Sequence, residues 1–229
     1  PRAAAAGPGG RWSLVRDLVR SPVRSTERAA AWATTLLDRH GVVARETASI
    51  EALGGGFSGV YQVLRSLEEQ GKVRRGYFVE GLGGAQFAYP GIVDRLRRVR
   101  DGEVEGEVVA LAATDPANPY GWLLPWPGLA ESGGRDPTRS TGSTVFLVDG
   151  EPALYLDRKG RRLRTFADAG DEAVERALPA LRWVAAREPR RALSLEQVDG
   201  VAAFKSPLKP AMEAAGFTSD YRYVRVPGG

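Results

Sequence analysis

Cysteine is absent from the 229-residue sequence, and histidine occurs once, at His40. Without cysteine the chain cannot form a disulfide, a thiolate zinc site, an iron–sulfur cluster or a cysteine nucleophile. A single histidine also disfavours a His-rich metal site and a Ser-His-Asp triad. No uninterrupted apolar run approaches the roughly 20 residues of a membrane span, and no signal-peptide pattern opens the chain. We therefore expect a cytoplasmic protein with no metal site and no membrane partner.

A nucleotide-binding loop is missing as well. The sequence contains no G-x-x-x-x-G-K-[ST] pattern, so this chain cannot be a P-loop ATPase by itself. The glycine-rich run at 54–59 (G-G-G-F-S-G) resembles such a loop but lacks the Lys-Ser/Thr pair that follows the glycines. We expect no cofactor in this chain.

What is present is the composition of a globular protein, with 43% hydrophobic and 26% charged residues. The length allows one large domain or two small ones. The first ten residues consist only of Pro, Arg, Ala and Gly, which cannot form a packed core. The chain also begins with Pro1 and not with Met, so we interpret it as a piece of a longer protein whose residues 1–24 form an N-terminal arm.

Charge divides the sequence into two parts. Residues 1–100 hold 16 basic and 9 acidic residues, whereas 101–229 hold 16 and 19. The basic part is the one expected to face phosphate. Because the acidic, glycine-containing stretch 101–107 follows a basic helical ending at 94–100, we place a domain boundary there, between domains at 25–100 and 101–229.

The first domain has the element order of a winged helix. Apolar residues recur at helical spacing after Ser25, a possible N-cap, and that helix is closed by Gly41 in the left-handed conformation. We expect His40 to cap the same end. The other expected helices lie at 46–53 and from Ser58 to Gly71, and the expected strands at 42–45, 73–80 and 86–89.

The second domain is predicted to be an α+β fold with an antiparallel, β-barrel-like sheet and packed helices. Its turns include Asp149-Gly150 and Lys159-Gly160, and Pro179 should kink or divide its longest helix. A long loop rich in Pro, Gly and Trp occupies 115–141. The expected strands are 107–114, 143–148, 153–157, 161–166, 193–198 and 221–226, and the expected helices are 171–186 and 207–215.

The third helix of a winged-helix module is the usual recognition helix, and the hairpin after it adds basic residues. An arginine can hold a phosphate or a guanine edge, and a glutamine can pair with adenine. Glu68 and Glu69 oppose phosphate, and winged helices also serve protein–protein contact, so both interpretations stay open. The candidate DNA contacts of this module are Tyr61, Gln62, Arg65, Arg74 and Arg75.

A second basic cluster lies at the predicted hairpin turn 158–164. Strand alternation puts Arg162 and Arg164 on one face, where Arg162 is a candidate nucleic-acid contact, although a charged hairpin tip is more often a solvated turn. Tyr120, Trp122 and Trp126 in the long loop could stack unpaired bases. We favour the alternative that these aromatic residues plug the edge of the barrel.

Four runs resemble the large helicase-related (Lhr) proteins, bacterial superfamily 2 helicases with a long C-terminal extension. They are G-R-W-S at 10–13, nearly all of 37–90, A-T-D-P-A-N-P-Y-G at 113–121 and V-D-G-E-P-A-L-Y-L at 148–156. The resemblance implies the end of an ATP-dependent DNA helicase and translocase that moves 3′ to 5′ in DNA repair. It also implies that ATP and Mg²⁺ bind upstream in the parent chain, that single-stranded or tailed duplex DNA is a partner, and that this region assembles homo-oligomers.

The same resemblance raises the possibility of base excision, including uracil removal, which is attributed to the C-terminal region of some family members. Related glycosylases use a Gln-x-Gln or Gln-x-Asp motif, and Gln197-Val198-Asp199 fits the second form. A three-residue match is expected by chance, and a strand end at Gly200 explains it equally well. Three hypotheses therefore remain: DNA binding with oligomer assembly, a DNA glycosylase with Gln197 and Asp199 at its site, and a purely architectural protein-binding module.

Overall fold

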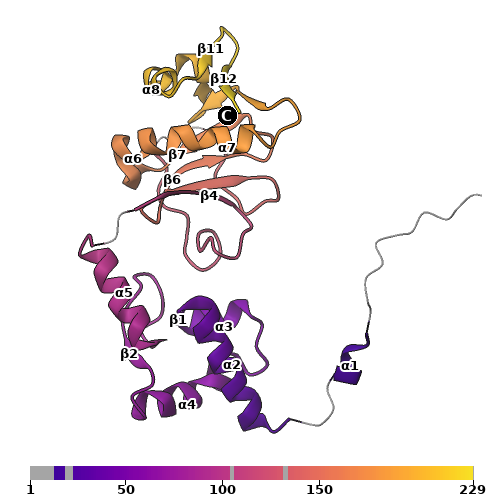
Figure 1. Cartoon of the computed structure of the whole chain (residues 1–229), viewed down its shortest axis with the longest axis vertical. Helices are drawn as coiled ribbons and strands as arrows, with labels where there is room; N and C mark the ends of the chain where they lie inside the picture. Colours follow the sequence, from indigo (N-terminus) through magenta and orange to yellow (C-terminus); the bar gives the residue numbers. More distant parts are fainter. Residues whose placement is uncertain (1–12, 19–22, 104–105, 131–133, 229) are drawn as a thin grey trace, which may run out of the picture. The chain divides into compact units, whose positions relative to one another are not determined.

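A computed structural model describes residues 13–18, 23–103, 106–130 and 134–228, which form two compact units (Figure 1). The first unit holds the described residues up to Phe78 together with Gly83–Ile92. The second holds Val79–Leu82 and the described residues from Val93 onward. Most of the predicted arm 1–24 lies outside the described residues, and the predicted limit at 100/101 stays a prediction. None of the helices in the part described is long and apolar enough to cross a membrane.

The first unit is a winged helix, as predicted. Its three strands pair antiparallel in the order β1-β3-β2, so the strand after the first helix joins the later hairpin. Beyond this unit's sheet the chain continues into α5 (Pro90–Arg100). The short helix α1 (Val15–Leu18) precedes α2 in the chain. The elements of the unit are α2 (Ser25–His40), β1 (Val42–Val43), α3 (Arg45–Ile50), α4 (Gly56–Glu69), β2 (Arg74–Gly76) and β3 (Gln86–Ala88).

Helical periodicity builds the core of this unit. Leu36 and Leu37 of α2 are buried one turn before Gly41, whose N–H donates to the Leu37 carbonyl oxygen at 2.9 Å. Gly41 has φ +70°, so it ends the helix in the left-handed region that glycine adopts without strain. Leu64 of α4 and Phe87 of β3 complete the cluster, so α2 and α4 are held against the sheet.

The recognition helix α4 begins earlier than Ser58. Gly55 precedes it with φ +90°, Gly56 also has a positive φ, and Ser58 lies inside the helix as an exposed residue. The prediction of Ser58 as N-cap is therefore wrong. The physical reason is the glycine run, because two consecutive positive φ values let the chain turn into the helix without a side-chain cap.

The second unit combines two sheets with a helical layer. The six-stranded sheet has the order β10-β9-β7-β6-β5-β4, and the three-stranded sheet the order β11-β12-β8. The strands are β4 (Val108–Ala112), β5 (Thr144–Val148), β6 (Glu151–Leu156), β7 (Arg162–Thr165), β8 (Ala192–Leu195), β9 (Gln197–Val198), β10 (Val201–Ala202), β11 (Thr218–Ser219) and β12 (Val224–Pro227). The helices are η1 (Ala167–Ala169), α6 (Gly170–Ala177), η2 (Leu178–Ala180), α7 (Leu181–Ala185), η3 (Ala203–Lys205) and α8 (Lys209–Ala214).

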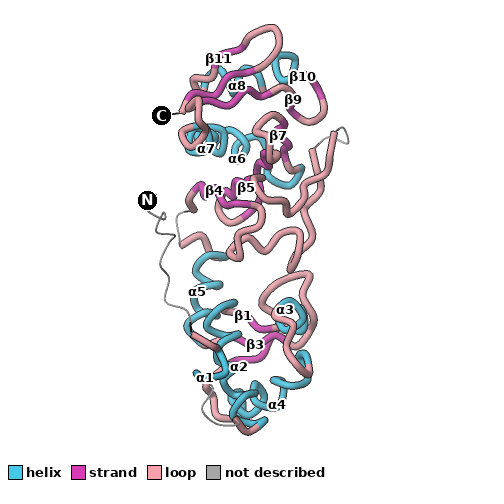
Figure 2. The backbone as a smooth tube through the Cα atoms, turned by 90° about the vertical axis from the view of Figure 1, so that its right-hand side faces the viewer, coloured by secondary structure: helices cyan, strands magenta, loops and turns pink. Residues whose placement is uncertain are grey.

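The α+β content is confirmed, but the barrel-like arrangement is not. β10 and β4 are the outer strands of the larger sheet, and within the part described they do not pair with each other. Closure requires that pairing. Helices cover the open sheet instead of a closed barrel wall. Helix α6 packs on β5 and β6, and α7 packs on β8 and β12. Figure 2 shows both helices between the two sheets. Leu154, Leu178 and Leu181 meet in the shared core.

Two sequence features of this unit had different outcomes. Pro179 divides the predicted long helix into α6, η2 and α7, as expected for a residue without a backbone donor. The single strand predicted at 193–198 is instead two strands in two sheets, β8 and β9, separated by Glu196. The backbone N–H groups of Glu196 and Gln197 both donate to the Arg161 carbonyl oxygen, which fixes the crossing.

Candidate nucleic-acid interface

The helix α4 presents a polar side to solvent. Gln62 and Arg65 are exposed, whereas Val60 and Leu64 on the opposite side are buried. Tyr61 is half-buried, because its ring lies 5.7 Å from the ring of Phe57 and 5.9 Å from that of Phe87. Of the three predicted contacts on this helix, Gln62 and Arg65 are exposed to solvent, whereas Tyr61 is only partly accessible.

Carboxylates of the same unit engage its arginines. Arg65 Nε lies 3.2 Å from Glu69 Oε1, and Arg75 Nε lies 3.2 Å from Glu68 Oε1. The side chains of Arg65 and Glu69 are 57% and 64% exposed. Ion pairs this exposed are worth about 0–1 kcal/mol, so a phosphate can displace the carboxylate at small cost.

The hairpin contributes two exposed arginines on consecutive positions of β2. Arg74 pairs in register with Ala88, and Arg75 with Phe87. Consecutive strand residues point to opposite faces, so the two guanidinium groups leave the sheet on different sides. Arg75 is the one that contacts α4 through Glu68.

An open groove of about 440 Å³ lies beside α4. It is lined by Phe57, Ser58, Tyr61 and Gln62, and also by Arg45. Arg45 is the first residue of α3 and is exposed. Sequence reasoning missed Arg45, because the approach of α3 to α4 is what brings it to the groove. The available signal was a cation at the start of the helix before the glycine run.

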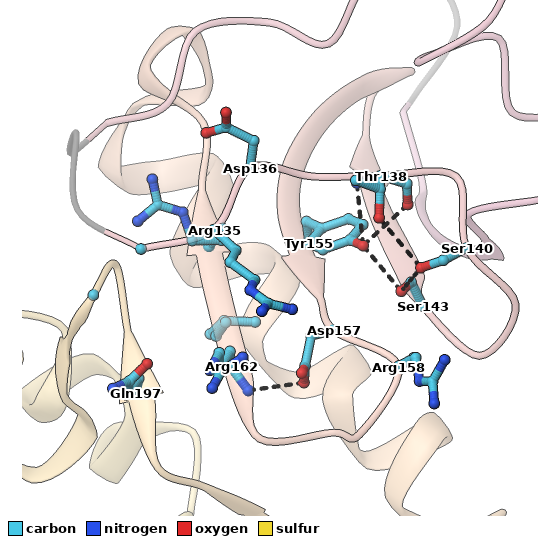
Figure 3. A pocket seen from close by; sticks show the side chains of 14 residues that line it. Arg135, Asp136, Thr138, Ser140, Ser143, Tyr155, Asp157, Arg158, Arg162 and Gln197 are labelled. Atoms are coloured by element: carbon cyan, nitrogen blue, oxygen red, sulfur yellow. Dashed lines mark hydrogen bonds between the residues drawn. The ribbon is translucent and has the colours of Figure 1, made fainter.

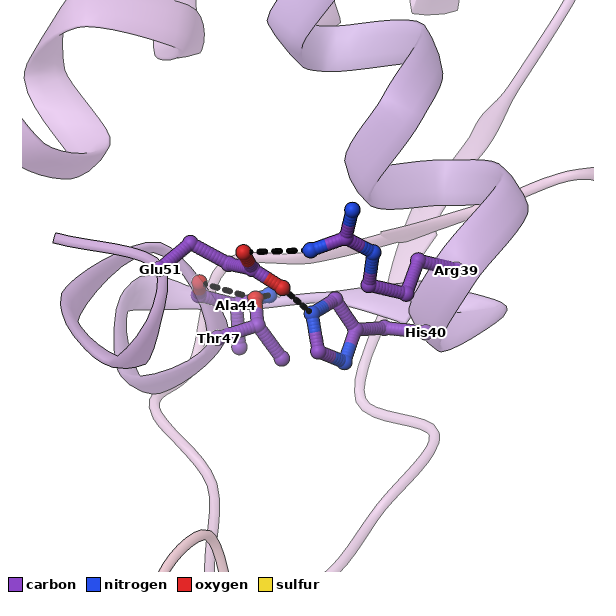
Figure 4. Close-up of polar contacts among 5 residues, drawn as sticks. All are labelled: Arg39, His40, Ala44, Thr47 and Glu51. Carbon is purple, nitrogen blue, oxygen red and sulfur yellow. Dashed lines mark hydrogen bonds and ion pairs between the residues drawn. The ribbon is translucent and has the colours of Figure 1, made fainter. Parts of the chain in front are cut away.

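A polar cluster fixes the end of α2 to α3 (Figure 4). Glu51 Oε2 lies 2.5 Å from Arg39 Nη1, and its Oε1 lies 3.0 Å from His40 Nε2. The hydrogen bond from Arg39 holds the pKa of the Glu51 carboxyl below its usual range, the contact with His40 lowers it further, and partial burial opposes both. The prediction that His40 caps α2 is wrong, since its ring contacts Glu51 and the backbone N–H of Gly41 closes the helix.

In the second unit the two predicted arginines of β7 have different environments. Arg162 is exposed, but Arg164 is buried, with its side chain 4% exposed. Arg164 Nη1 lies 3.6 Å from Asp199 Oδ1. Both arginines line one cavity, as the strand alternation predicts, but Arg164 is buried because a carboxylate from a distant turn pairs with its guanidinium.

The candidate glycosylase residues do not meet at one site. Asp199 has φ +50°, and its two carboxylate oxygens accept hydrogen bonds from the backbone N–H and the hydroxyl of Thr165, both at 2.9 Å. Gln197 lines a cavity of about 160 Å³, whereas Asp199 lines a different cavity of about 410 Å³. The contacts of Asp199 are those of a residue that fixes the turn between β9 and β10.

The aromatic residues of the long loop pack onto the sheet. Trp126 stacks on Tyr120 and Phe166, with ring centroids 6.3 Å and 6.0 Å apart. Trp122 is exposed, and the Arg139 guanidinium lies 4.7 Å from its ring centroid. The packing role favoured over base stacking fits Tyr120 and Trp126, although the sheet that they cover is open, whereas Trp122 stays exposed.

Similarity to known proteins identifies the family of this chain. The sequence profile of the winged-helix domain of the large helicase-related protein matches residues 22–108. An Escherichia coli (strain K12) protein named "Lhr helicase/uracil glycosylase" is 37% identical over 213 residues, or 92% of this chain. The chain belongs to the large helicase-related family.

A second relative extends this result. The Mycolicibacterium smegmatis protein named "Lhr helicase/ probable uracil glycosylase" is 41% identical over 229 residues, covering 95% of the present chain. The chain spans only 14% and 15% of the lengths of these two Lhr proteins. It is therefore one segment of an Lhr-type protein, and the winged helix is the part that the family profile identifies.

Proposed function

We propose that this chain is a nucleic-acid-binding segment of an ATP-dependent DNA helicase and that its winged helix contacts single-stranded or tailed duplex DNA. The observation that carries the proposal is the groove beside α4, where Arg45, Gln62 and Tyr61 line the wall and Arg65 is exposed one turn further along the helix. Arginine and glutamine side chains can contact phosphates and base edges, and the partly exposed ring of Tyr61 could contact an unpaired base.

The parent protein would supply the motor. Translocation from 3′ to 5′, coupling to DNA repair and the binding of ATP and Mg²⁺ would depend on parts outside this sequence, which has no P-loop. We also propose that the segment joins copies of the parent into a homo-oligomer. Analytical ultracentrifugation of the 229-residue chain tests that part: a concentration-dependent shift to a larger species supports it, and a monomer at all concentrations contradicts it.

DNA binding is tested by fluorescence anisotropy on the whole chain, using labelled single-stranded, tailed and blunt duplex oligonucleotides from 50 to 300 mM salt. The logarithm of the association constant should fall linearly with the logarithm of salt concentration. Arg65→Ala and Arg45→Ala should each reduce the magnitude of that slope by about 1.

The matched control is Arg187→Ala, which removes one exposed positive charge after α7 in the second unit. It should leave the slope unchanged if the winged helix provides the contact. Equal effects of Arg65→Ala and Arg187→Ala would indicate only a general charge effect. The absence of salt-dependent binding, together with self-association, would instead favour the architectural hypothesis.

Base excision is a second candidate function. The printed names of both relatives include a uracil glycosylase, and the 410 Å³ cavity combines apolar walls at Phe166, Val174 and Leu208 with the carboxylate of Asp199. A carboxylate beside a flipped base could orient water for glycosidic cleavage. The hydrogen bonds from Thr165 to Asp199 make this the weaker candidate.

Alkali-sensitive cleavage of a uracil-containing single strand tests that second function. Cleavage by the wild type that is lost in Asp199→Asn, with DNA affinity and thermal stability retained, would support it. No cleavage by the wild type, or cleavage that persists in Asp199→Asn, would exclude Asp199 as its catalytic residue.

A further inference from the structure

A cavity of about 160 Å³ lies at the end of β7 in the second unit (Figure 3). It is lined by the loop 134–143, the end of β6 with the turn that follows it, the strand β7, and β9 with the turn that follows it. The hydroxyl-bearing residues gather on one side of the view, and Gln197 lies on the other. All of these segments belong to one compact unit, so the cavity is formed within that unit.

Three arginines at this cavity form no ion pair within the described part of the chain. Among the residues that the structure describes, no carboxylate forms an ion pair with Arg135, Arg158 or Arg162, all of which are exposed lining residues. The neighbouring Arg161 differs, because its Nη1 lies 2.9 Å from Glu196 Oε1. Within the described residues, the three cavity arginines therefore have no ion pair, whereas Arg161 beside the cavity has one.

One of the two acidic side chains that line the cavity already accepts hydrogen bonds in the hairpin turn. Asp157 Oδ1 accepts the backbone N–H of Arg161 at 2.8 Å and that of Arg162 at 3.0 Å. Asp136 is the other acidic lining residue, and since Arg164 is paired with Asp199, three further arginines face two aspartates in the lining. An anion that enters the cavity meets a net positive lining.

A network of hydroxyl groups forms the opposite wall. The phenol oxygen of Tyr155 lies 2.9 Å from Ser143 Oγ and 3.0 Å from the carbonyl oxygen of Thr138, and Ser140 Oγ lies 2.9 Å from Ser143 Oγ. Ser143 and Tyr155 are buried. The network fastens the loop to β6, so the wall is held in place before any ligand arrives.

Glycine shapes the rim. A Cβ atom on Gly134 would lie 3.2 Å from Arg164 Nη1 and 3.4 Å from the Cα atom of Gly200. Gly134 also has φ +92°, a conformation that strains other residues, and an added Cβ atom would require Arg164 to shift slightly. The rim therefore depends on backbone proximity as well as on charge.

We propose that this cavity holds a phosphate group of a DNA strand, a proposal that rests on the DNA-binding function inferred above. Guanidinium groups match phosphate through paired N–H donors, and fixed hydroxyls add further hydrogen bonds. The phosphate could be a monoester at a strand end or an internal diester. The buried wall of Ser143, Tyr155 and Leu163 closes one side of the cavity, which suits a group that enters end-on.

The test compares single variants of the whole chain on 12-nucleotide single strands with a 5′ phosphate, a 3′ phosphate or neither. Arg158→Ala and Arg162→Ala remove cavity arginines, and Arg161→Ala is the control with the same charge change on the same hairpin. If a strand end is bound, the wild type prefers one phosphorylated strand about tenfold, and that preference is lost in Arg158→Ala and Arg162→Ala but kept in Arg161→Ala.

If an internal phosphate is bound, the wild type shows no preference, and each cavity variant weakens all three strands about tenfold more than the control does. Equal affinities of Arg158→Ala, Arg162→Ala and Arg161→Ala for every strand would overturn the proposal. Arg158 and Arg162 are exposed, so neither substitution should disturb the core. An unchanged thermal unfolding curve then confirms that each variant is folded.

A readout without DNA separates this proposal from the DNA-binding function. Titration with inorganic phosphate should shift the backbone amide resonances of Gly134 and Gly200 in the wild type and not in Arg162→Ala. Phosphate-induced shifts in a protein that does not bind DNA would contradict the proposed DNA-binding function but support an anion site in this cavity. The phosphate site alone would be contradicted if DNA binding depended on Arg65, phosphate shifted neither resonance, and Arg162→Ala had no effect on DNA affinity.

Discussion

At the scale of single residues, carboxylates set how much positive charge the winged helix offers to a ligand. Glu69 and Glu68 each hold an arginine on or next to α4 at 3.2 Å. These pairs are exposed, so water and salt screen them. The arginines are therefore oriented in the free protein without being withdrawn from the surface.

Glu69→Gln should raise the affinity for DNA about twofold to fivefold, because it frees Arg65 and removes a charge that repels phosphate. Anisotropy at low salt measures the change, which should shrink as salt rises. Glu175→Gln on α6 is the control, since it removes one exposed carboxylate from the other unit. An equal gain in both variants would show that net charge alone is responsible.

Glu51 makes the first unit sensitive to acid. Since its pKa is lowered in the folded state, the folded protein binds fewer protons than the unfolded chain, and the contribution to stability is complete above the ordinary value of 4.5. That contribution is lost as the pH falls through the lowered pKa. Glu51→Gln should reduce the free energy of unfolding by about 1 kcal/mol at pH 7 and by less near pH 3.

Denaturant unfolding of the wild type and Glu51→Gln from pH 3 to pH 7 checks this expectation. The two curves of stability against pH should converge in acid. Parallel curves across the whole range would mean that the contacts of Glu51 with Arg39 and His40 do not depend on its charge.

At the scale of elements, the start of α4 depends on backbone conformation more than on side chains. Gly55→Ala should destabilise the first unit by about 1 kcal/mol, because an alanine at φ +90° is strained although its Cβ atom would have room. Gly54→Ala is the matched control, as its φ is not in the positive range and nothing lies near the added atom. Thermal unfolding distinguishes the two, and equal losses would contradict the argument.

Elements with local signals were predictable from the sequence. The spacing of Leu36, Leu37 and Leu64 and the glycines after α2 gave the winged helix, and the same periodicity placed Gln62 and Arg65 on the solvent side. Contacts between distant segments were not predictable in this way. Closure of the sheet depends on whether its two outer strands pair. In the part of the chain described they do not, and the helical layer covers the apolar face of the sheet.

The candidate sites show the same limit. Strand alternation assigned Arg162 and Arg164 to one face, but it contained no information that Asp199 would draw Arg164 inward. Arg45 was missed because its place beside α4 follows from packing of α3. The Gln-x-Asp motif likewise suggested that Gln197 and Asp199 act together, whereas the turn places them on different cavities.

At the scale of the whole molecule, separate cores predict separate responses to damage. Phe87 lies in the core of the first unit and Leu181 in that of the second, and both are fully buried. Phe87→Ala should cost about 3–5 kcal/mol and Leu181→Ala about 2–5 kcal/mol, each in its own unit.

Hydrogen exchange read by mass spectrometry locates these losses. Phe87→Ala should speed exchange in α2 and α4 and leave β5 and β6 protected, and Leu181→Ala should do the reverse. If either variant deprotected both sets of elements equally, the two units would unfold as one cooperative body.

The crossing at Glu196 has a consequence for chain length. Leu195 before it and Val198 after it are buried in strands of different sheets, and only one residue separates the two strands. Adding or deleting a residue there would turn the side chains of one strand to the opposite face. Natural variation in length should therefore accumulate in the long loop after β4 and spare this junction, where the two sheets share a single connecting residue.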